Sequence, residues 1–451
     1  MTMGTNASAR YARFWRWHFF AAAIVVPFVL WQSVTGTLYL WAERWMDRAH
    51  PQLRFVKSAP QSVPLSAQIG AALAAVPETD SHVFAAAHAP AEMPLHHGSP
   101  HHTPASSSGL TVQEILAPQD PGRSTAVLLQ DAAGVPYPVF VDPHTGQVLG
   151  RLAAAQWLPG WTRALHGGWP LGKPGSWLLE LGDGWAILSI LTGLYLWWPR
   201  GRGLLAGLWP RVSQGTRVAL RDLHACVAVW FSLVFLFFLI SALPWTAFWG
   251  EVLLPRVESA SGQLSPAGFS PGGASPAQMR ASLPALDALI ATARARNVRG
   301  TLDIRLAPWP EAPLFVTNRN VWPKDDRILL GNSAGGGVTG DFRNADLPVV
   351  PRLVALGVHV HQGDFGAANV WLNTAFAAAL IWLSATGLTS WWIRRPQRGL
   401  GIPPRAGRPI TRGLKLSGLC LCLLLPLFGL SVLVLWLLDR CALAWSGSTN
   451  R

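Results

Sequence analysis

Long apolar segments recur along this chain and alternate with more polar regions. The five apolar segments lie at roughly 14–42, 176–198, 218–249, 369–393 and 413–438. Each is long enough to cross a hydrocarbon core about 30 Å thick as a helix, which takes about 20 residues. The pattern therefore predicts a mainly α membrane protein, a bundle of transmembrane helices with five spans.

The first apolar segment is expected to be retained as a span. Its apolar run is longer than the apolar core of a signal peptide, and no cleavage site of small residues follows it closely. Residues 1–42 are therefore interpreted as a cytoplasmic N-terminus followed by the first span.

Arginine-rich segments predict which side of the membrane each connection occupies. They lie at 10–16, 199–217 and 394–412. Basic residues concentrate on the cytoplasmic side of membrane proteins, so these segments are expected in the cytoplasm of a bacterium, beside its inner membrane. The regions expected in the periplasm are 43–175, 250–368 and the tail 439–451.

The two long periplasmic regions have the patterns of α+β domains. In the first, the predicted elements are a helix at Ser66–Val76, strands at Thr125–Leu129 and Pro138–Val141, and a strand–turn–strand at 140–150. In the second, they are a helix at Pro284–Arg296, strands at Thr301–Leu306 and Leu314–Thr317, and a glycine-rich turn at 331–340.

Composition and charge narrow the class of protein to an integral membrane protein. Charged residues make up 13% of the chain, against about 25% in soluble domains. The 24 tryptophans suit the aromatic belts at membrane surfaces. The net charge of +13 comes from arginines that crowd beside the apolar segments, which is typical of lipid headgroup contact and topology signals. A soluble, a disordered and a nucleic-acid-binding protein are therefore excluded.

A repeat relates the first and third spans. His18 lies near the start of the first span, 17 positions before Thr35. His224 lies near the start of the third span, also 17 positions before a hydroxyl residue, Ser241. The two spans therefore carry a histidine and a hydroxyl at the same separation.

The second and fourth spans repeat in the same way. LHGG with His166 precedes the second span, 26 positions before Thr192, and VHQG with His361 precedes the fourth, 25 positions before Thr386. The spans end alike, in TGLYLWWPR and TGLTSWWIRR. A tandem repeat of span, outer domain and span predicts a pseudo-two-fold axis along the membrane normal.

This symmetry predicts two pairs of histidines at opposite membrane faces. His18 and His224 are expected at equal depth near the cytoplasmic face, and His166 and His361 near the periplasmic face. A helix rises about 1.5 Å per residue, so the first span covers on the order of 35 Å between His18 and Trp41. The two pairs are therefore expected to be separate sites.

Two imidazoles that face each other in a membrane can hold one haem. Ionisable residues inside spans are usually functional, and imidazole is an axial ligand of haem iron. The chain has no CxxCH motif, so each haem would be b-type and bound without a covalent bond. Gly36, Gly193 and Gly387 would let helices part or approach around the flat macrocycle.

Other roles for these residues stay open. The histidines could be interfacial side chains. They could also relay protons with Glu180 and Asp183, which open the second span and could contact a proton or the substrate. Asp222, which opens the third span, is interpreted as a capping residue. Zinc fits poorly, because no cysteine or carboxylate cluster completes a four-ligand shell.

Several motifs occur in the order found in a known family. They are RFWRWHFF (13–20), VDPHTG (141–146), LHGGWPLGKPG (165–175), TGLYLWWPR (192–200), RDLHACVAVW (221–230) and VHQGDFG (360–366). With these motifs nearly the whole chain resembles the PepSY-associated transmembrane family, which includes iron-regulated inner-membrane proteins and ferric-siderophore reductases. The resemblance implies four core helices, two periplasmic PepSY-like domains and two b-type haems. The implied haem ligands are His18 with His224 and His166 with His361, with His359 as the alternate for His361.

The resemblance also implies an activity. Electrons from a cytoplasmic flavin or flavoprotein would pass through two haems to a ferric siderophore or other Fe(III) chelate in the periplasm, and Fe(II) would be released. The alternatives are a PepSY membrane protein that binds a ligand or regulates a protease, and a transporter of iron or haem.

A low-complexity insertion at 90–108 is rich in His, Pro and Ser. Its His96, His97, His101 and His102 predict a site for Cu(II), Zn(II) or Ni(II). A solvated flexible loop is the alternative interpretation.

Overall fold

The computed structural model divides the chain into two compact units. It describes residues 2–76, 110–131, 136–168, 170–199, 203–263, 273–306, 313–319, 322–397, 399–405 and 409–448. The helical unit comprises Met1–Val34, Lys173–Trp249 and Thr374–Arg451. The sheet unit comprises Thr35–Gly172 and Gly250–Asn373.

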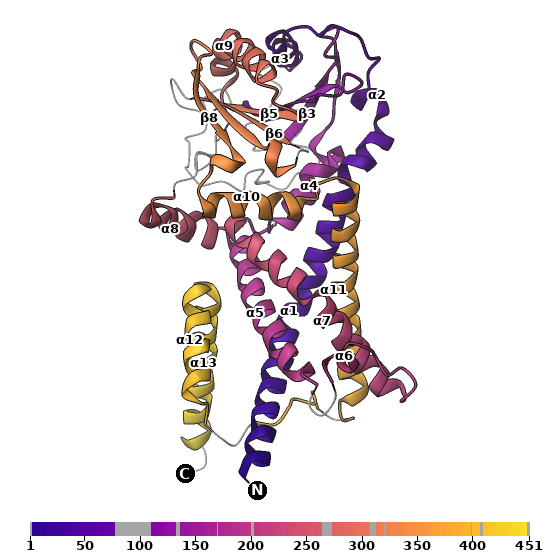
Figure 1. Cartoon of the computed structure of the whole chain (residues 1–451), viewed down its shortest axis with the longest axis vertical. Helices are drawn as coiled ribbons and strands as arrows, with labels where there is room; N and C mark the ends of the chain where they lie inside the picture. Colours follow the sequence, from indigo (N-terminus) through magenta and orange to yellow (C-terminus); the bar gives the residue numbers. More distant parts are fainter. Residues whose placement is uncertain are drawn as a thin grey trace. The chain divides into compact units, whose positions relative to one another are not determined.

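Four helices in the described part of the chain are long and apolar enough to cross a membrane. They belong to α1 Thr2–Ala49, α5 Lys173–Trp197, α7 Thr216–Ala242 with the turn Leu243–Trp245, and α11 Ala367–Arg394 (Figure 1). Their outer faces expose large apolar side chains such as Leu233 and Trp382, which lipid would cover. The chain is therefore a membrane protein, and these helices correspond to the first four predicted spans.

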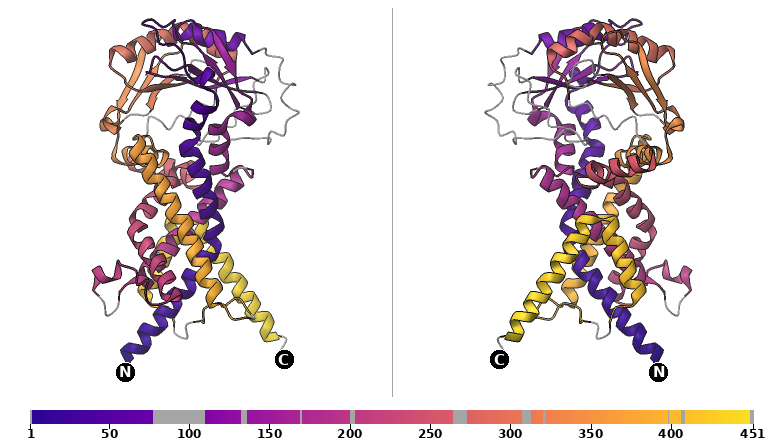
Figure 2. Two further views of the ribbon diagram at one scale, coloured as in Figure 1. Left: turned by 90° about the vertical axis from the view of Figure 1, so that its right-hand side faces the viewer. Right: turned by 90° about the vertical axis from the view of Figure 1, so that its left-hand side faces the viewer.

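The fifth predicted span, 413–438, is divided into two helices. α12 Arg412–Leu424 ends before Pro426, where α13 Pro426–Ser448 begins. Proline lacks a backbone N–H and disfavours helical geometry in the residue before it, so Leu425 leaves the helix. The two arms meet at this turn (Figure 2), and Asp439 pairs with Arg405 of the connection before α12, at 2.8 Å. The single span is therefore wrong. The chain turns back, so Asp439 does not lie across the membrane from that connection as the periplasmic assignment of 439–451 requires.

The turn of this hairpin packs against the other helices of the helical unit. Leu425 and Phe428 are buried in a cluster with Ala21 of α1 and Trp185 of α5. The indole N–H of Trp185 also donates a hydrogen bond to the Ser431 hydroxyl, at 3.1 Å. Contacts with two other helices therefore hold the hairpin at its turn.

One antiparallel sheet joins the two outer regions. In the part of the chain that the structure describes it has eight strands, in the order β4-β3-β2-β1-β5-β6-β7-β8. The strands are β1 Thr111–Ala117, β2 Thr125–Gln130, β3 Pro136–Val141, β4 Val148–Arg151, β5 Thr301–Leu306, β6 Leu314–Arg319, β7 Arg327–Gly331 and β8 Val338–Arg343. β1 pairs with β5 at the centre, with Ile115 opposite Ile304. The predicted strands are confirmed, but the two regions share one sheet instead of forming separate domains.

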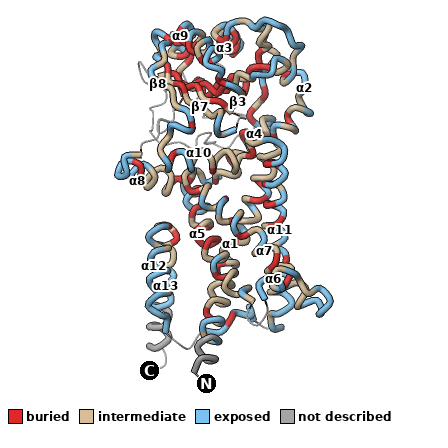
Figure 3. The backbone as a smooth tube through the Cα atoms, viewed as in Figure 1, coloured by how far each residue is buried: buried red, intermediate tan, exposed pale blue. Residues whose placement is uncertain are grey.

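Two helices cover one face of this sheet and form the main hydrophobic core. They are α3 Leu65–Ala74 and α9 Pro276–Ala295 (Figure 1). Ile69 and Leu289 from the helices pack with Ile115 and Ile304 from the central strands, and all four are fully buried. Figure 3 shows the buried parts of the strands in red. α9 begins before the predicted Pro284, because Ser275 and Gln278 form a capping box at its start.

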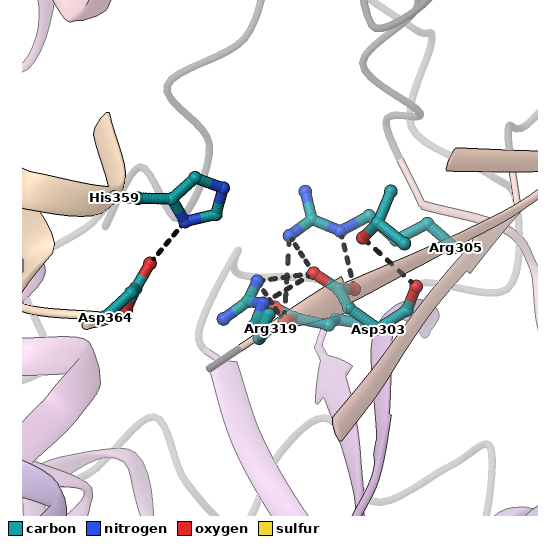
Figure 4. Close-up of polar contacts among 7 residues, drawn as sticks. Asp303, Arg305, Arg319, His359 and Asp364 are labelled. Carbon is teal, nitrogen blue, oxygen red and sulfur yellow. Dashed lines mark hydrogen bonds and ion pairs between the residues drawn. The ribbon is translucent and has the colours of Figure 1, made fainter. Parts of the chain in front are cut away.

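The opposite face of the sheet carries a buried ionic cluster, formed by Glu114, Asp303, Arg305 and Arg319. Figure 4 shows Asp303 with the two arginines. Asp303 accepts hydrogen bonds from Arg305, at 3.0 Å, and from Arg319, at 2.8 Å. Burial alone would raise the pKa of Asp303, but the two guanidinium groups outweigh it and hold this pKa below its usual range. Because Glu114 lies on β1 and the others lie on β5 and β6, the cluster stabilises the central junction of the sheet.

An Asp303→Asn variant is expected to lower the free energy of unfolding by about 3 kcal/mol, because removing one partner leaves buried charges without compensation. Denaturant unfolding in detergent measures this change. Glu43→Gln is the matched control, because Glu43 pairs with Arg54 at the surface and is 59% exposed, and such pairs contribute about 0–1 kcal/mol. Equal losses in the two variants would contradict a special role for the buried ionic cluster.

Candidate functional site

Two of the predicted histidines face each other within the helical unit. His18 lies on α1 and His224 lies on α7. Their ring centroids are 6.5 Å apart, and the ring planes make an angle of 79°. We call these two residues the inner pair.

The contacts of His18 determine which of its ring nitrogens carries the proton. Its Nδ1 atom lies 2.9 Å from the backbone carbonyl oxygen of Ser189 and 3.3 Å from the Thr192 hydroxyl. A carbonyl oxygen can only accept a hydrogen bond, so Nδ1 must be the donor. In the neutral ring, Nε2 then keeps its lone pair and can bind a metal ion.

His224 is held in the same way by the fourth span. Its Nδ1 atom lies 3.0 Å from the Thr386 hydroxyl oxygen. That hydroxyl donates its single proton to the Trp382 carbonyl, at 2.8 Å. The Thr386 oxygen therefore accepts from Nδ1–H of His224, and Nε2 is again the atom with a lone pair.

A glycine follows each of these threonines, and at Gly193 the missing side chain gives the imidazole room. A Cβ atom on Gly193 would lie 3.1 Å from Cε1 of His18, and one on Gly387 would lie 3.5 Å from Cε1 of His224. In the sheet unit, a Cβ on Gly36 would lie 3.1 Å from Cε1 of His166. These glycines were expected to make room for a macrocycle. Their direct contact in the structure is with the histidine rings.

The other two histidines face each other within the sheet unit. His166 ends α4 Leu158–His166, and His361 lies in the last turn of α10 Val349–Gln362. Their ring centroids are 6.1 Å apart, at an angle of 66°. Nδ1 of His166 lies 3.0 Å from the hydroxyl oxygen of Thr35. We call these two residues the outer pair.

His359, the alternate ligand, lies in a different environment from His361. Its Nδ1 is 2.8 Å from Asp364 (Figure 4), and its Nε2 is 3.3 Å from Asp326. Burial lowers the pKa of His359, but these two carboxylates outweigh it and raise the pKa to about 9. Burial lowers the pKa of His361 to about 4, so that ring is neutral. The structure therefore pairs His361 with His166 and engages both nitrogens of His359 elsewhere.

The spacing within each pair suits one shared metal ion. A metal–imidazole bond is about 2.0 Å long, and a ring nitrogen lies about 1.1 Å from the ring centre. Two imidazoles on opposite sides of one metal ion therefore place their centroids about 6.2 Å apart. The distances of 6.5 and 6.1 Å lie on either side of this value. Among the described residues, no group of three or more His, Cys, Asp or Glu could hold a metal. Within the part of the chain that the structure describes, each pair therefore offers two imidazoles and no cluster of further ligands.

The acidic residues proposed for proton transfer have different surroundings. Glu180 accepts hydrogen bonds from the backbone N–H groups of Phe248, at 3.3 Å, and Trp249, at 3.0 Å, which is a structural role. Asp183 makes no hydrogen bond within the part of the chain that the structure describes. Asp222 forms ion pairs with Arg211 and Arg221. Asp183 is therefore the acidic residue of the second span whose carboxylate has no structural role assigned to it.

Sequence reasoning missed the hydrogen-bond partners of the histidines. Thr35, Thr192 and Thr386 marked the repeat, but each contacts a histidine of another helix. The signal was the Thr-Gly dipeptide, which occurs at all three positions. The insertion histidines predicted as metal ligands lie outside the described residues; they are His96, His97, His101 and His102.

Comparison with known proteins assigns the chain to a family. The family model described as the PepSY-associated TM region matches residues 15–394. The match includes both histidine pairs and ends with α11, before the α12–α13 hairpin. A comparison with curated proteins found no match.

Proposed function

Because the chain belongs to the PepSY-associated TM region family, we propose that it is a di-haem b reductase of the bacterial inner membrane. It passes electrons from the cytoplasmic side to ferric chelates such as siderophores in the periplasm. The observation that carries this proposal is the occurrence of two histidine pairs, each with the spacing of two ligands on one metal ion.

The residues of each pair fit b-type haem. His18 and His224 would hold one group, and His166 and His361 would hold the other. Bound haem supplies one-electron redox chemistry. Nδ1 of His18 and of His224 donates to oxygen atoms of the protein, so each Nε2 is available to iron. The side chains of all four histidines are partly buried.

The proposed direction of electron transfer rests on the distribution of basic residues along the chain. The arginine-rich segments 10–16, 199–217 and 394–412 support a cytoplasmic location for these segments by the positive-inside rule, and a flavin or flavoprotein there would supply the electrons. A bilayer about 30 Å thick favours more than one redox centre along the path. Each Fe(III) takes up one electron, and Fe(II) is a softer ion that hard oxygen donors hold less tightly. Reduction therefore releases the metal from its chelate.

Reconstitution in sealed vesicles tests this function. The purified chain is expected to produce Fe(II) outside vesicles that contain reduced flavin mononucleotide inside and an impermeant ferric hydroxamate outside. One reduced flavin gives two electrons and two protons, so it reduces two Fe(III). An impermeant ferrous indicator measures the rate, and vesicles without protein give the background.

Two results of this experiment would count against the proposal. Fe(II) formation at the background rate, with haem present in the chain, would exclude the reductase. Iron uptake into the vesicles without any reductant would favour a transporter instead.

A further inference from the structure

Each Thr-Gly dipeptide forms a seat for an imidazole from a neighbouring helix. The threonine hydroxyl contacts Nδ1, and Cε1 lies beside the glycine. A Cβ would crowd the ring at Gly193 and Gly36, whereas at Gly387 it would make an ordinary van der Waals contact. The arrangement occurs for His18 on Thr192-Gly193, for His224 on Thr386-Gly387, and for His166 on Thr35-Gly36. The recurrence at three of the four paired histidines indicates a role that plain helix packing does not require.

We propose that these threonines are positioning residues that orient the haem-ligating imidazoles, and that Thr386 also sets the tautomer of His224. This inference rests on the proposed function. It assigns a task to Thr192 and Thr386 that neither the family match nor the histidine pairs assign.

Thr192 and Thr386, the threonines beside the inner pair, can only accept a hydrogen bond from the histidine. Thr192 donates to the Leu188 carbonyl at 2.7 Å, just as Thr386 donates to the Trp382 carbonyl at 2.8 Å. With the only hydroxyl proton used in its own helix, the oxygen can only accept from Nδ1–H of the histidine. The wrong tautomer, with a proton on Nε2, would lose this hydrogen bond and would place a proton where iron must bind.

The glycine completes the control of orientation. A Cβ at Gly193 would lie 3.1 Å from His18 Cε1, which is closer than most real Cβ contacts. A side chain at residue 193 would require the ring to shift by a few tenths of an ångström from its place beside α5. A hydrogen bond to the distal nitrogen also makes an imidazole a stronger electron donor, and such outer partners commonly change metal affinity 10- to 100-fold.

Thr386→Val tests this inference, because valine keeps the shape of threonine and removes the hydroxyl. The variant is expected to bind the inner haem about tenfold more weakly, which is the low end of that range. Its midpoint potential is expected to rise, because a weaker donor stabilises Fe(III) less. Thr386→Ser keeps the hydroxyl and should restore both values.

Ser384→Ala is the matched control. Ser384 is buried on the same helix, two positions from Thr386, and its hydroxyl donates to the Leu380 carbonyl at 2.9 Å. This variant should leave the haem affinity, the potential and the electron paramagnetic resonance spectrum unchanged. Thr192→Val provides an independent test on His18 if Thr386→Val does not fold.

The outcomes separate this inference from the function on which it rests. Haem in the wild type with an unchanged potential and spectrum in both valine variants would overturn the inference alone. Equal shifts in Ser384→Ala would overturn it too, because they would indicate a general loss of packing. A wild-type chain that binds no haem would overturn the inference and the proposed function together.

Discussion

A His224→Ala variant is expected to contain one b-type haem per chain where the wild type contains two. The ring of His224 faces His18 at 6.5 Å between centroids, so its loss leaves the inner haem with a single protein ligand. The outer pair does not include His224 and should keep its haem. The pyridine haemochrome assay, divided by the protein concentration, measures this ratio.

The pattern across the four single variants is the sharper part of this prediction. His18→Ala should leave the same remaining haem as His224→Ala, with the same potential. His166→Ala and His361→Ala should both leave the other haem. His359→Gln serves as the control and should keep both, because Asp326 and Asp364 engage the two nitrogens of His359. Loss of haem in His359→Gln with retention in His361→Ala would show that the pairing of the outer histidines is wrong.

The second large effect is expected on ferric reduction across the membrane. His361→Ala should lower the rate of Fe(II) formation in sealed vesicles to that of vesicles without protein. The two haems act in series in the proposed function, so the loss of either one interrupts the path.

The same variant provides its own internal control. In His361→Ala, the inner histidine pair is intact, so reduced flavin inside the vesicles should still reduce one haem at the wild-type rate. Ferric reduction that continues at a substantial rate in this variant, with the outer haem absent, would contradict a path through the outer pair.

The repeat made the histidine pairs predictable, but not the seats that hold them. Equal spacing from His18 to Thr35 and from His224 to Ser241 identified which residues occupy equivalent positions. It could not show that Thr35 would contact His166, because that contact joins helices 131 positions apart. Spacing along one helix defines a face, whereas a contact between helices depends on how they pack.

The sheet and the α12–α13 hairpin also differ from what local sequence patterns predict. Local patterns predict β2 to β6 within a few residues, since alternation and turns are local properties, but they do not predict β1, β7 or β8 as strands. Ile115 on β1 pairs with Ile304 on β5, far away in the sequence. Local patterns do not show this pairing, so they predict two domains where the structure has one sheet. The segment 413–438 had the composition of a span, and Pro426 was the local signal that it would be interrupted.

A redox titration of the purified wild-type chain, followed by its optical spectrum, is the most direct test of whether each histidine pair holds one haem. Two histidine pairs that each hold one haem predict two haems b per chain, both low-spin, which titrate in two one-electron steps. A purified, folded chain without haem, or with a single haem that titrates in one step, would contradict the central claim.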